Sequence, residues 1–275
     1  MTFSIVATDG AAWGVAVASK FLAVGAAVPA ARAGVGALAT QALANLAYRP
    51  DGLILLGNGH SAAEVLETLT LADEQREHRQ AGVVDAAGRS ATYTGSECHD
   101  WAGGVAGDGY AIQGNILTGP DVVTAMERAW TASDPHAPLS RRLLAALAAG
   151  DDAGGDRRGR QSAALLVVTP DGGYGGGSDV YADLRVDDHA DPVRELIRLL
   201  DLHDIYFMKP DTDAALPLGG DLADEVRQRL AGLGHNEPDL DAALASWAGI
   251  ENYEERLLPG LIDPVVLEQL RMLSE

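Results

Sequence analysis

The start of the chain combines a hydroxyl nucleophile with a means of activating it. Thr2 follows Met1, and a small second residue is the usual context in which an initiator methionine is removed. A freed Thr2 would carry a β-hydroxyl and an α-amine on the same residue. Because an α-amine has a pKa of about 7.7–8.0, part of it is unprotonated near neutral pH and can take the hydroxyl proton. Thr2 is therefore a candidate nucleophile that supplies its own base.

Lys20 is the cation that we expect beside Thr2. Two apolar runs flank Asp9-Gly10, and this arrangement predicts a β-hairpin. With a tight turn, Thr2 lies roughly opposite Val17, and Lys20 ends the second strand about 10 Å further along. Its ammonium would lower the pKa of both the α-amine and the hydroxyl. Lys20 and Lys209 are the only lysines among 20 cationic residues, which favours a specific use of the ammonium. The alternative is that Thr2 and Lys20 are ordinary strand residues.

Polar residues at strand ends are candidates for an oxyanion donor and for substrate binding. Asn115 ends an expected strand and could place an amide near a developing alkoxide, and Gln41 ends another strand. Arg160 and Ser162 close a polar loop and could orient a substrate carboxylate, since arginine binds a carboxylate through two donors. The alternative is that these are strand-end, turn or solvated loop residues.

An acidic cluster with one imidazole follows the last strand of the first domain: Asp187, Asp188, His189 and Asp191. These groups suit a divalent ion, but adjacent residues cannot all point one way, and Asp191-Pro192 is an ordinary helix start. We therefore expect no metal. Instead we assign Asp187, Asp188 and His189 a supporting role around the site, with either aspartate paired to Lys20 or Arg160. The alternative is a metal-dependent hydrolase centred on this cluster.

The order of the elements predicts an α+β fold, a four-layer αββα sandwich. Strands and helices come in blocks, which disfavours a purely parallel βαβ sheet and fits two antiparallel sheets with helix pairs outside. The segment 21–32 is expected to be an irregular connection. After the N-terminal hairpin, the expected strands are 34–41, 80–85, 90–94, 110–116, 163–169 and 181–186, and the expected helices are 51–56, 62–70, 121–131, 139–149 and 193–207.

The domain organisation is predicted from a change in composition near residue 209. Residues 209–220 are rich in Pro, Gly and Asp and indicate a linker after a first domain at 1–208. Residues 221–275 predict a small all-helical module of about 55 residues, near the lower limit for independent stability.

The composition disfavours several classes of protein. The 275 residues carry a net charge of −20, which argues against nucleic-acid and anionic-membrane partners. A single cysteine, Cys98, excludes an internal disulfide framework and a thiol-based zinc site. No signal peptide or membrane span is visible, because the longest apolar stretch, 21–31, is short and contains Pro29. We therefore expect a cytoplasmic protein.

The chain also resembles a known family. Four stretches, together with the 154–162 loop, resemble the domain-of-unknown-function family numbered 1028; they are 2–7, 15–21, 34–41 and 184–192. The block order, with Thr2 at the start and Lys20 closing the second strand, looks like the N-terminal nucleophile (Ntn) hydrolase architecture. The tail resembles a peptidoglycan-binding module found at the C-terminus of some members. This resemblance implies a hydrolase of amide-like bonds with Thr2 as nucleophile.

We therefore expect an Ntn-type amidohydrolase that acts on a small-molecule amide, either an acylated amine or an amino-acid derivative. Thr2 would attack the carbonyl, its α-amine would move the proton, and water would release the acyl-enzyme ester. We expect no cofactor, and we expect a homo-oligomer. The competing hypothesis is a non-catalytic binding protein on the same scaffold, which retention of Met1 would favour.

Overall fold

The computed structural model describes residues 2–274, so that Met1, whose removal we expect, lies outside the described residues. The chain forms two compact units that divide between Leu199 and Leu200. This division falls within helix α5 (Pro192–Phe207), whereas the sequence pattern suggested a first domain extending to residue 208. The boundaries of the linker at 209–220 stay predictions.

The first unit contains two antiparallel sheets. The strands are β1 (Thr2–Thr8), β2 (Trp13–Ser19), β3 (Pro29–Arg32), β4 (Gly36–Ala42), β5 (Arg79–Asp85), β6 (Ser90–Thr94), β7 (Gly103–Gly107), β8 (Tyr110–Asn115), β9 (Ser162–Val168) and β10 (Val180–Val186). One sheet has the order β10-β9-β2-β1-β8-β7 and the other β3-β4-β5-β6. Because β1 lies inside the larger sheet, its first residue has a hydrogen-bonded strand on each side.

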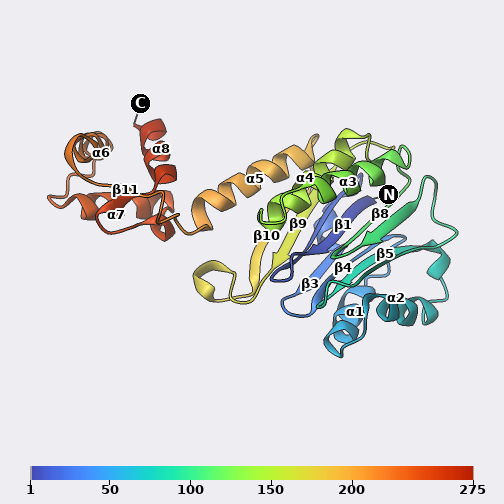
Figure 1. The fold of residues 1–275 in the computed structure, drawn as a ribbon. Helices are drawn as coiled ribbons and strands as arrows, with labels where there is room; N and C mark the ends of the chain where they lie inside the picture. The colour runs from blue at the N-terminus through green and yellow to red at the C-terminus, as the bar shows by residue number, and fades with distance from the viewer. Residues whose placement is uncertain (1, 275) are drawn as a thin grey trace. The chain divides into compact units, whose positions relative to one another are not determined.

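Helices cover the outer faces of both sheets, as Figure 1 shows. Helices α3 (Asp121–Ala132) and α4 (Leu139–Asp152) lie over the six-stranded sheet, and α4 packs on β1 and β2. Helices α1 (Tyr48–Gly57) and α2 (Ala62–Leu71) pack on β4 and β5 of the four-stranded sheet. Valine and alanine make up most of the buried cluster between the sheets. The predicted αββα sandwich is confirmed.

Two strands of the first unit were missing from the sequence-based prediction, and both lie at sheet edges. β3 falls within the 21–32 segment that we expected to be irregular, and it begins at Pro29. β7 is rich in glycine. Proline and glycine lower strand propensity and are tolerated at edges, where one side of the strand makes no ladder hydrogen bonds. These strands therefore depend on their neighbours more than on their own sequences.

The β1–β2 hairpin exists, but its predicted register was wrong by two residues. Ser4, not Thr2, lies opposite Val17, and Thr8 lies opposite Trp13. The loop is therefore Asp9–Ala12, in which Asp9 Oδ1 accepts the N–H groups of the last two loop residues at 2.9 and 2.8 Å. Gly10 adopts a φ of 91°, a left-handed conformation that glycine adopts without a steric penalty. The longer loop brings Ser19 opposite Thr2.

The second unit is mainly helical. Its core is formed by the helices α6 (Gly220–Gly232), α7 (Leu240–Glu251) and α8 (Pro264–Leu273). Trp247 of α7 is buried in this core. A short pair of strands, β11 (Leu216–Pro217) and β12 (Leu261–Ile262), was not predicted and joins residues distant in sequence.

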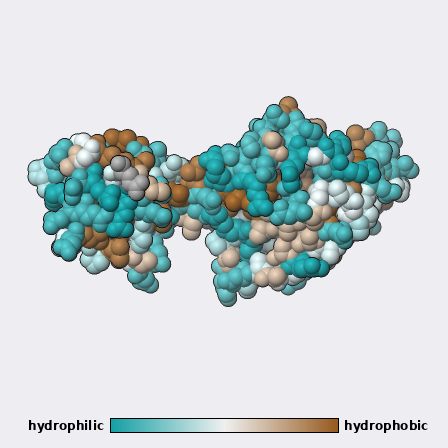
Figure 2. Space-filling view, turned by 90° about the horizontal axis from the view of Figure 1, so that it is seen from above, coloured by the Kyte–Doolittle hydropathy of each residue, from teal (hydrophilic) through white to brown (hydrophobic). Residues whose placement is uncertain are grey.

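The surface of the first unit agrees with the acidic composition of the chain. Hydrophilic residues predominate on the face of this unit seen in Figure 2, and the chain carries a net charge of −20. Within residues 2–274, no helix has the length and hydropathy needed to cross a bilayer.

Candidate functional site

Thr2 lies at an end of the sandwich where several strands begin or end. Its side chain is buried, with 5% exposed, and its Oγ1 lies 3.1 Å from Ser19 Oγ, within hydrogen-bond distance. On its other side, Thr2 pairs in register with Asn115 of β8. Its backbone carbonyl accepts a hydrogen bond from Gln41 Nε2 at 3.3 Å. The structure therefore brings Gln41 and Asn115 to Thr2. Gln41 is buried and holds the Thr2 backbone, so that the structure gives no support to its predicted role in substrate binding.

A buried network of amides supports this end of the sheets. Gln80 Oε1 accepts hydrogen bonds from Gln41 Nε2 and Asn115 Nδ2, both at 2.8 Å. Ser4 Oγ donates to Gln41 Oε1 at 2.7 Å and accepts from Gln113 Nε2 at 2.6 Å. The network joins the two sheets, because Gln41 and Gln80 lie in one and the other members lie in the second. It therefore fixes the orientation of Asn115 and of the Thr2 backbone.

Ser4, Gln80 and Gln113 are members of this network that sequence reasoning missed. All three are fully buried, and Gln113 packs so closely on Gly82 that a Cβ there would lie 2.0 Å from Gln113 Oε1. The available signal was alternation: Gln113 and Ser4 are polar residues at inward-facing positions of strands that are otherwise apolar. Such residues need buried partners. Gln113 Nε2 donates to Ser4 in the neighbouring strand of the same sheet, and Ser4 Oγ donates to Gln41 across the sandwich.

Next to Asn115 is a cavity of about 240 Å³, which we name the inter-sheet cavity. Its less exposed lining residues are Ala42, Cys98, Asn115 and Ile116, and the exposed residues Leu43, His78, Glu97 and His99 stand around them. Burial raises the pKa of the Cys98 thiol, so that the thiol stays protonated near neutral pH. Cys98 therefore acts as part of an apolar wall.

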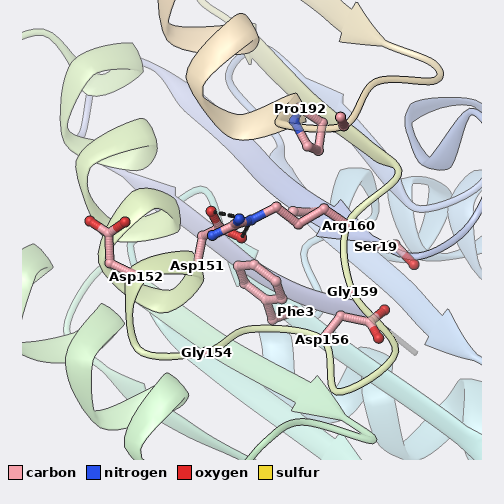
Figure 3. A pocket seen from close by; sticks show the side chains of 11 residues that line it. Phe3, Ser19, Asp151, Asp152, Gly154, Asp156, Gly159, Arg160 and Pro192 are labelled. Carbon is pink, nitrogen blue, oxygen red and sulfur yellow. Dashed lines mark hydrogen bonds and ion pairs between the residues drawn. The ribbon is translucent and has the colours of Figure 1, made fainter.

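A second cavity, of about 390 Å³, lies on the α4 side of β1 and is shown in Figure 3. We name it the acidic cavity; its lining includes Phe3, Ser19, Asp151, Asp152, Asp156 and Arg160. Arg160 Nε lies 2.9 Å from each carboxylate oxygen of Asp151, and this pairing raises the pKa of Arg160. Because Arg160 already has a carboxylate partner within the cavity, the structure gives no support to its predicted role with a substrate carboxylate.

Lys20 contacts the loop that closes the acidic cavity. Its backbone N–H donates to Asp156 Oδ2 at 2.7 Å, and its Nζ donates to the Arg160 carbonyl at 3.2 Å. Adjacent residues of a strand point to opposite faces, so that Ser19, not Lys20, presents its side chain to Thr2. The group beside the Thr2 hydroxyl is therefore a second hydroxyl, where an ammonium was expected.

Ser162 was expected to bind substrate, but its hydroxyl serves the fold. The side chain is fully buried; Oγ donates to the Phe21 carbonyl and accepts the Val24 N–H at 3.1 Å. Ser162 therefore holds the connection that follows β2. Ser162 is the first residue of β9, and its contacts with this connection explain why a polar residue opens an apolar strand.

The acidic cluster is also used differently from the prediction. Asp187 lies 3.5 Å from Arg185, and Asp188 accepts from Gln161 Nε2 at 3.1 Å, whereas Lys20 and Arg160 have the other partners described above. His189 Nδ1 accepts the Asp191 N–H at 3.0 Å. Among residues 2–274, no group of three or more His, Cys, Asp or Glu side chains could hold a metal ion. The structure therefore gives no support to the metal-dependent alternative.

Comparisons with known proteins agree with the fold. A family model described as "Family of unknown function (DUF1028)" matches residues 2–196, and one described as "Putative peptidoglycan binding domain" matches residues 206–270. The crystal structure of protein SPO2555 from Silicibacter pomeroyi, assigned to the same DUF1028 family, shares 33% sequence identity with a TM-score of 0.66. That alignment covers 82% of this chain and 94% of SPO2555.

A second solved structure is more distant. Anbu (ancestral beta-subunit) from Yersinia bercovieri shares 11% identity with a TM-score of 0.36, covering 73% of this chain and 93% of Anbu. No curated protein matches the chain. The family model covers most of the chain from Thr2 onward, and SPO2555 extends that match to an experimental fold. The chain therefore belongs to the family of unknown function numbered 1028.

Proposed function

We propose that this protein is an N-terminal nucleophile amidohydrolase that cleaves a small acyl-amide through Thr2. The observation that carries the proposal is the environment of the Thr2 hydroxyl. It lies at the first position of an interior strand, 3.1 Å from the Ser19 hydroxyl and one strand away from the Asn115 amide. The family model also begins at Thr2, the residue that loss of Met1 would make N-terminal.

In the proposed reaction, the Thr2 α-amine takes the proton of Oγ1, directly or through a water, as Oγ1 attacks the amide carbonyl. The carbonyl becomes an alkoxide, and the C–N bond then breaks as the leaving amine receives the proton. Water adds to the resulting ester, and the carboxylic acid leaves while Oγ1 regains its proton. Ser19 Oγ orients the Thr2 hydroxyl through their hydrogen bond.

We assign Asn115 to the developing alkoxide. Its Nδ2 carries two hydrogens, and the hydrogen bond to Gln80 Oε1 at 2.8 Å employs one of them. This bond holds the amide in place before the substrate arrives, which is the condition for effective electrostatic stabilisation. Lys20, held by Asp156 and the Arg160 carbonyl, is assigned to shaping the end of β2.

The test is covalent labelling of the purified protein with a small β-lactone, followed by mass spectrometry of intact protein and of its N-terminal peptide. We expect loss of Met1 and one acyl adduct on Thr2. Thr2→Ser should still be labelled, because it keeps a hydroxyl and an amine, whereas Thr2→Ala should not.

The matched control is Thr8→Ala, which removes a buried threonine hydroxyl from the opposite end of the same strand. Thr8→Ala should be labelled like the parent protein. Quantitative retention of Met1, or equal labelling of Thr2→Ala and the parent, would remove the nucleophile and favour a non-catalytic binding protein.

A further inference from the structure

We infer that the inter-sheet cavity is the acyl-binding pocket and that it selects short apolar acyl groups. This inference rests on the proposed function and names its substrate class. It assigns the leaving amine no pocket of its own.

The position of the cavity relative to Thr2 is the first argument. Asn115 lines the cavity and is also the register partner of Thr2 in β8. Directly opposed residues in an antiparallel pair have Cα atoms about 4.5–5.5 Å apart. A carbonyl between Thr2 Oγ1 and the Asn115 amide therefore has its acyl substituent next to the cavity.

The chemistry of the walls is the second argument. Ala42, Cys98 and Ile116 offer methyl, thiol and butyl surfaces, and Asn115 is the polar group among the less exposed lining residues. Pockets that bind small molecules commonly combine apolar walls with a few placed polar groups. The charged and imidazole side chains of the lining belong to exposed residues. An apolar acyl chain with one carbonyl at Asn115 matches this distribution.

The volume of the cavity sets how much of an acyl chain it can hold. An apolar cavity of roughly 150 Å³ is known to hold benzene, which corresponds to about 25 Å³ for each non-hydrogen atom. On that scale the inter-sheet cavity, at about 240 Å³, holds on the order of ten non-hydrogen atoms. After the amide group itself, this leaves room for an acyl chain of about four to seven carbons.

Strained backbone at the walls is the third argument. Ala42 and Ile116 adopt φ values of 69° and 50°, in the left-handed region that non-glycine residues rarely occupy. Each directly follows a residue of the amide network, Gln41 and Asn115 respectively. For a β-branched residue such as Ile116 this conformation is a genuine outlier, and such outliers cluster at ligand sites. Here both of them turn the chain along the wall of one cavity.

A buried ion pair supports the same wall. Arg79 donates through Nη1 to the Leu43 carbonyl and through Nε to Asp73 Oδ2 at 2.8 Å. Asp73 also accepts from Asn45 Nδ2 and the Tyr48 hydroxyl, both at 3.0 Å. The loop after β4 is thereby held in one conformation, so that the cavity is formed before a ligand binds.

The experiment compares acetyl, hexanoyl and decanoyl p-nitroanilides as substrates. We expect kcat/KM to be highest for hexanoyl, with a gain of about fourfold for each methylene that enters the cavity. Cys98→Phe fills the cavity and should lower kcat/KM for the hexanoyl substrate by about 30-fold or more. The kcat/KM for the acetyl substrate should change by less than about threefold. Ile116→Ala enlarges the cavity and should raise kcat/KM for the decanoyl substrate, relative to that for the hexanoyl substrate, by about tenfold.

The control is Ile54→Ala, an equivalent truncation of an exposed isoleucine on α1, and it should leave the profile unchanged. A profile that is flat with chain length, or one that Cys98→Phe leaves unaltered in an active enzyme, would overturn the pocket and leave the proposed function standing.

A binding measurement separates failure of the pocket from failure of the nucleophile. Thr2→Ala is titrated with the unreactive probes hexanamide and acetamide by calorimetry, alone and combined with Cys98→Phe. Tighter binding of hexanamide that the Cys98→Phe change abolishes supports the pocket even if the parent enzyme hydrolyses no amide. Equal binding of the two amides, or binding that Cys98→Phe does not affect, would overturn it.

Discussion

The two cavities on either side of β1 use polar groups in opposite ways. In the acidic cavity, Asp151 pairs with Arg160, and Asp156 accepts hydrogen bonds from Lys20 and Arg158. Its charges therefore bind parts of the chain to one another. In the inter-sheet cavity, apolar walls surround the amide of Asn115, which a buried network holds in place. The charges of the acidic cavity are paired within the chain, so that charge alone is a poor guide to where a substrate would react.

The largest effect that we expect is the loss of hydrolysis in Thr2→Ala. Removal of a nucleophile that acts together with its base should lower kcat by at least about 10⁴-fold. Asp156→Asn, a change at the acidic cavity, should lower kcat by less than about tenfold. Initial rates with hexanoyl p-nitroanilide measure both. A greater loss in Asp156→Asn than in Thr2→Ala would move the reacting centre to the acidic cavity.

The next effect concerns stability. Arg79→Met leaves the Asp73 carboxylate buried without its cation, which should cost about 3–5 kcal/mol in the free energy of unfolding. Arg160→Met breaks an ion pair whose arginine side chain is 46% exposed, so that the cost should be about 1 kcal/mol or less. Urea unfolding of both variants measures the difference. Equal costs would show that burial of the pair is not the deciding factor.

A smaller effect is expected at the proposed oxyanion donor. Asn115→Ala should lower kcat by about 10²–10³-fold, equivalent to about 2.7–4 kcal/mol in the barrier, with little change in KM. Gln80→Leu should lower kcat less and leave one amide hydrogen bond of Asn115 unmade. An unchanged kcat in Asn115→Ala, in a variant shown to be folded by its unfolding curve, would assign the alkoxide to another donor.

The smallest effect is a dependence of stability on pH. The Arg79 guanidinium holds the pKa of Asp73 well below its ordinary value, which is about 3.9 in an unfolded chain. A depressed folded-state pKa means that the contribution is complete above that ordinary value and is lost as the pH falls below it. The stability of the parent should therefore decrease between about pH 5 and pH 3 more than that of Asp73→Asn. The measurement is the free energy of unfolding of both proteins as a function of pH. An equal decrease in the two proteins would contradict this assignment.

Local patterns in the chain were sufficient for most of the elements. The helix expected over 62–70 is present as α2, and Ser61 and Glu64 cap its start through both reciprocal hydrogen bonds of a capping box. Asp9-Gly10 predicted a hairpin. Gln41 and Asn115 were identified as candidate site residues because they are polar and end expected strands. These features depend on interactions between residues that are close in sequence, so that a short segment is enough to predict them.

Contacts between distant segments were less accessible. The partner of Arg160, the burial of Ser162 and the network through Gln80 all depend on how separate strands meet. The register of the first hairpin failed for a local reason. Thr8 Oγ1 donates to the Ala12 carbonyl and Asp9 Oδ1 accepts the Ala12 N–H, and these bonds stabilise a longer loop than the Asp-Gly pair suggested.

Most strands and helices of the first unit, and with them the place of a threonine at the start of the first strand, followed from residue types and their periodicity. The interior position of that strand in its sheet did not. The residues that surround that threonine could not be predicted in this way. Ser19 reaches it from β2, Asn115 reaches it from β8 on the other side of β1, and Gln41 reaches it from the opposite sheet. Hydrophobic burial specifies which face of each strand turns inward, whereas sheet packing alone determines which polar groups meet there.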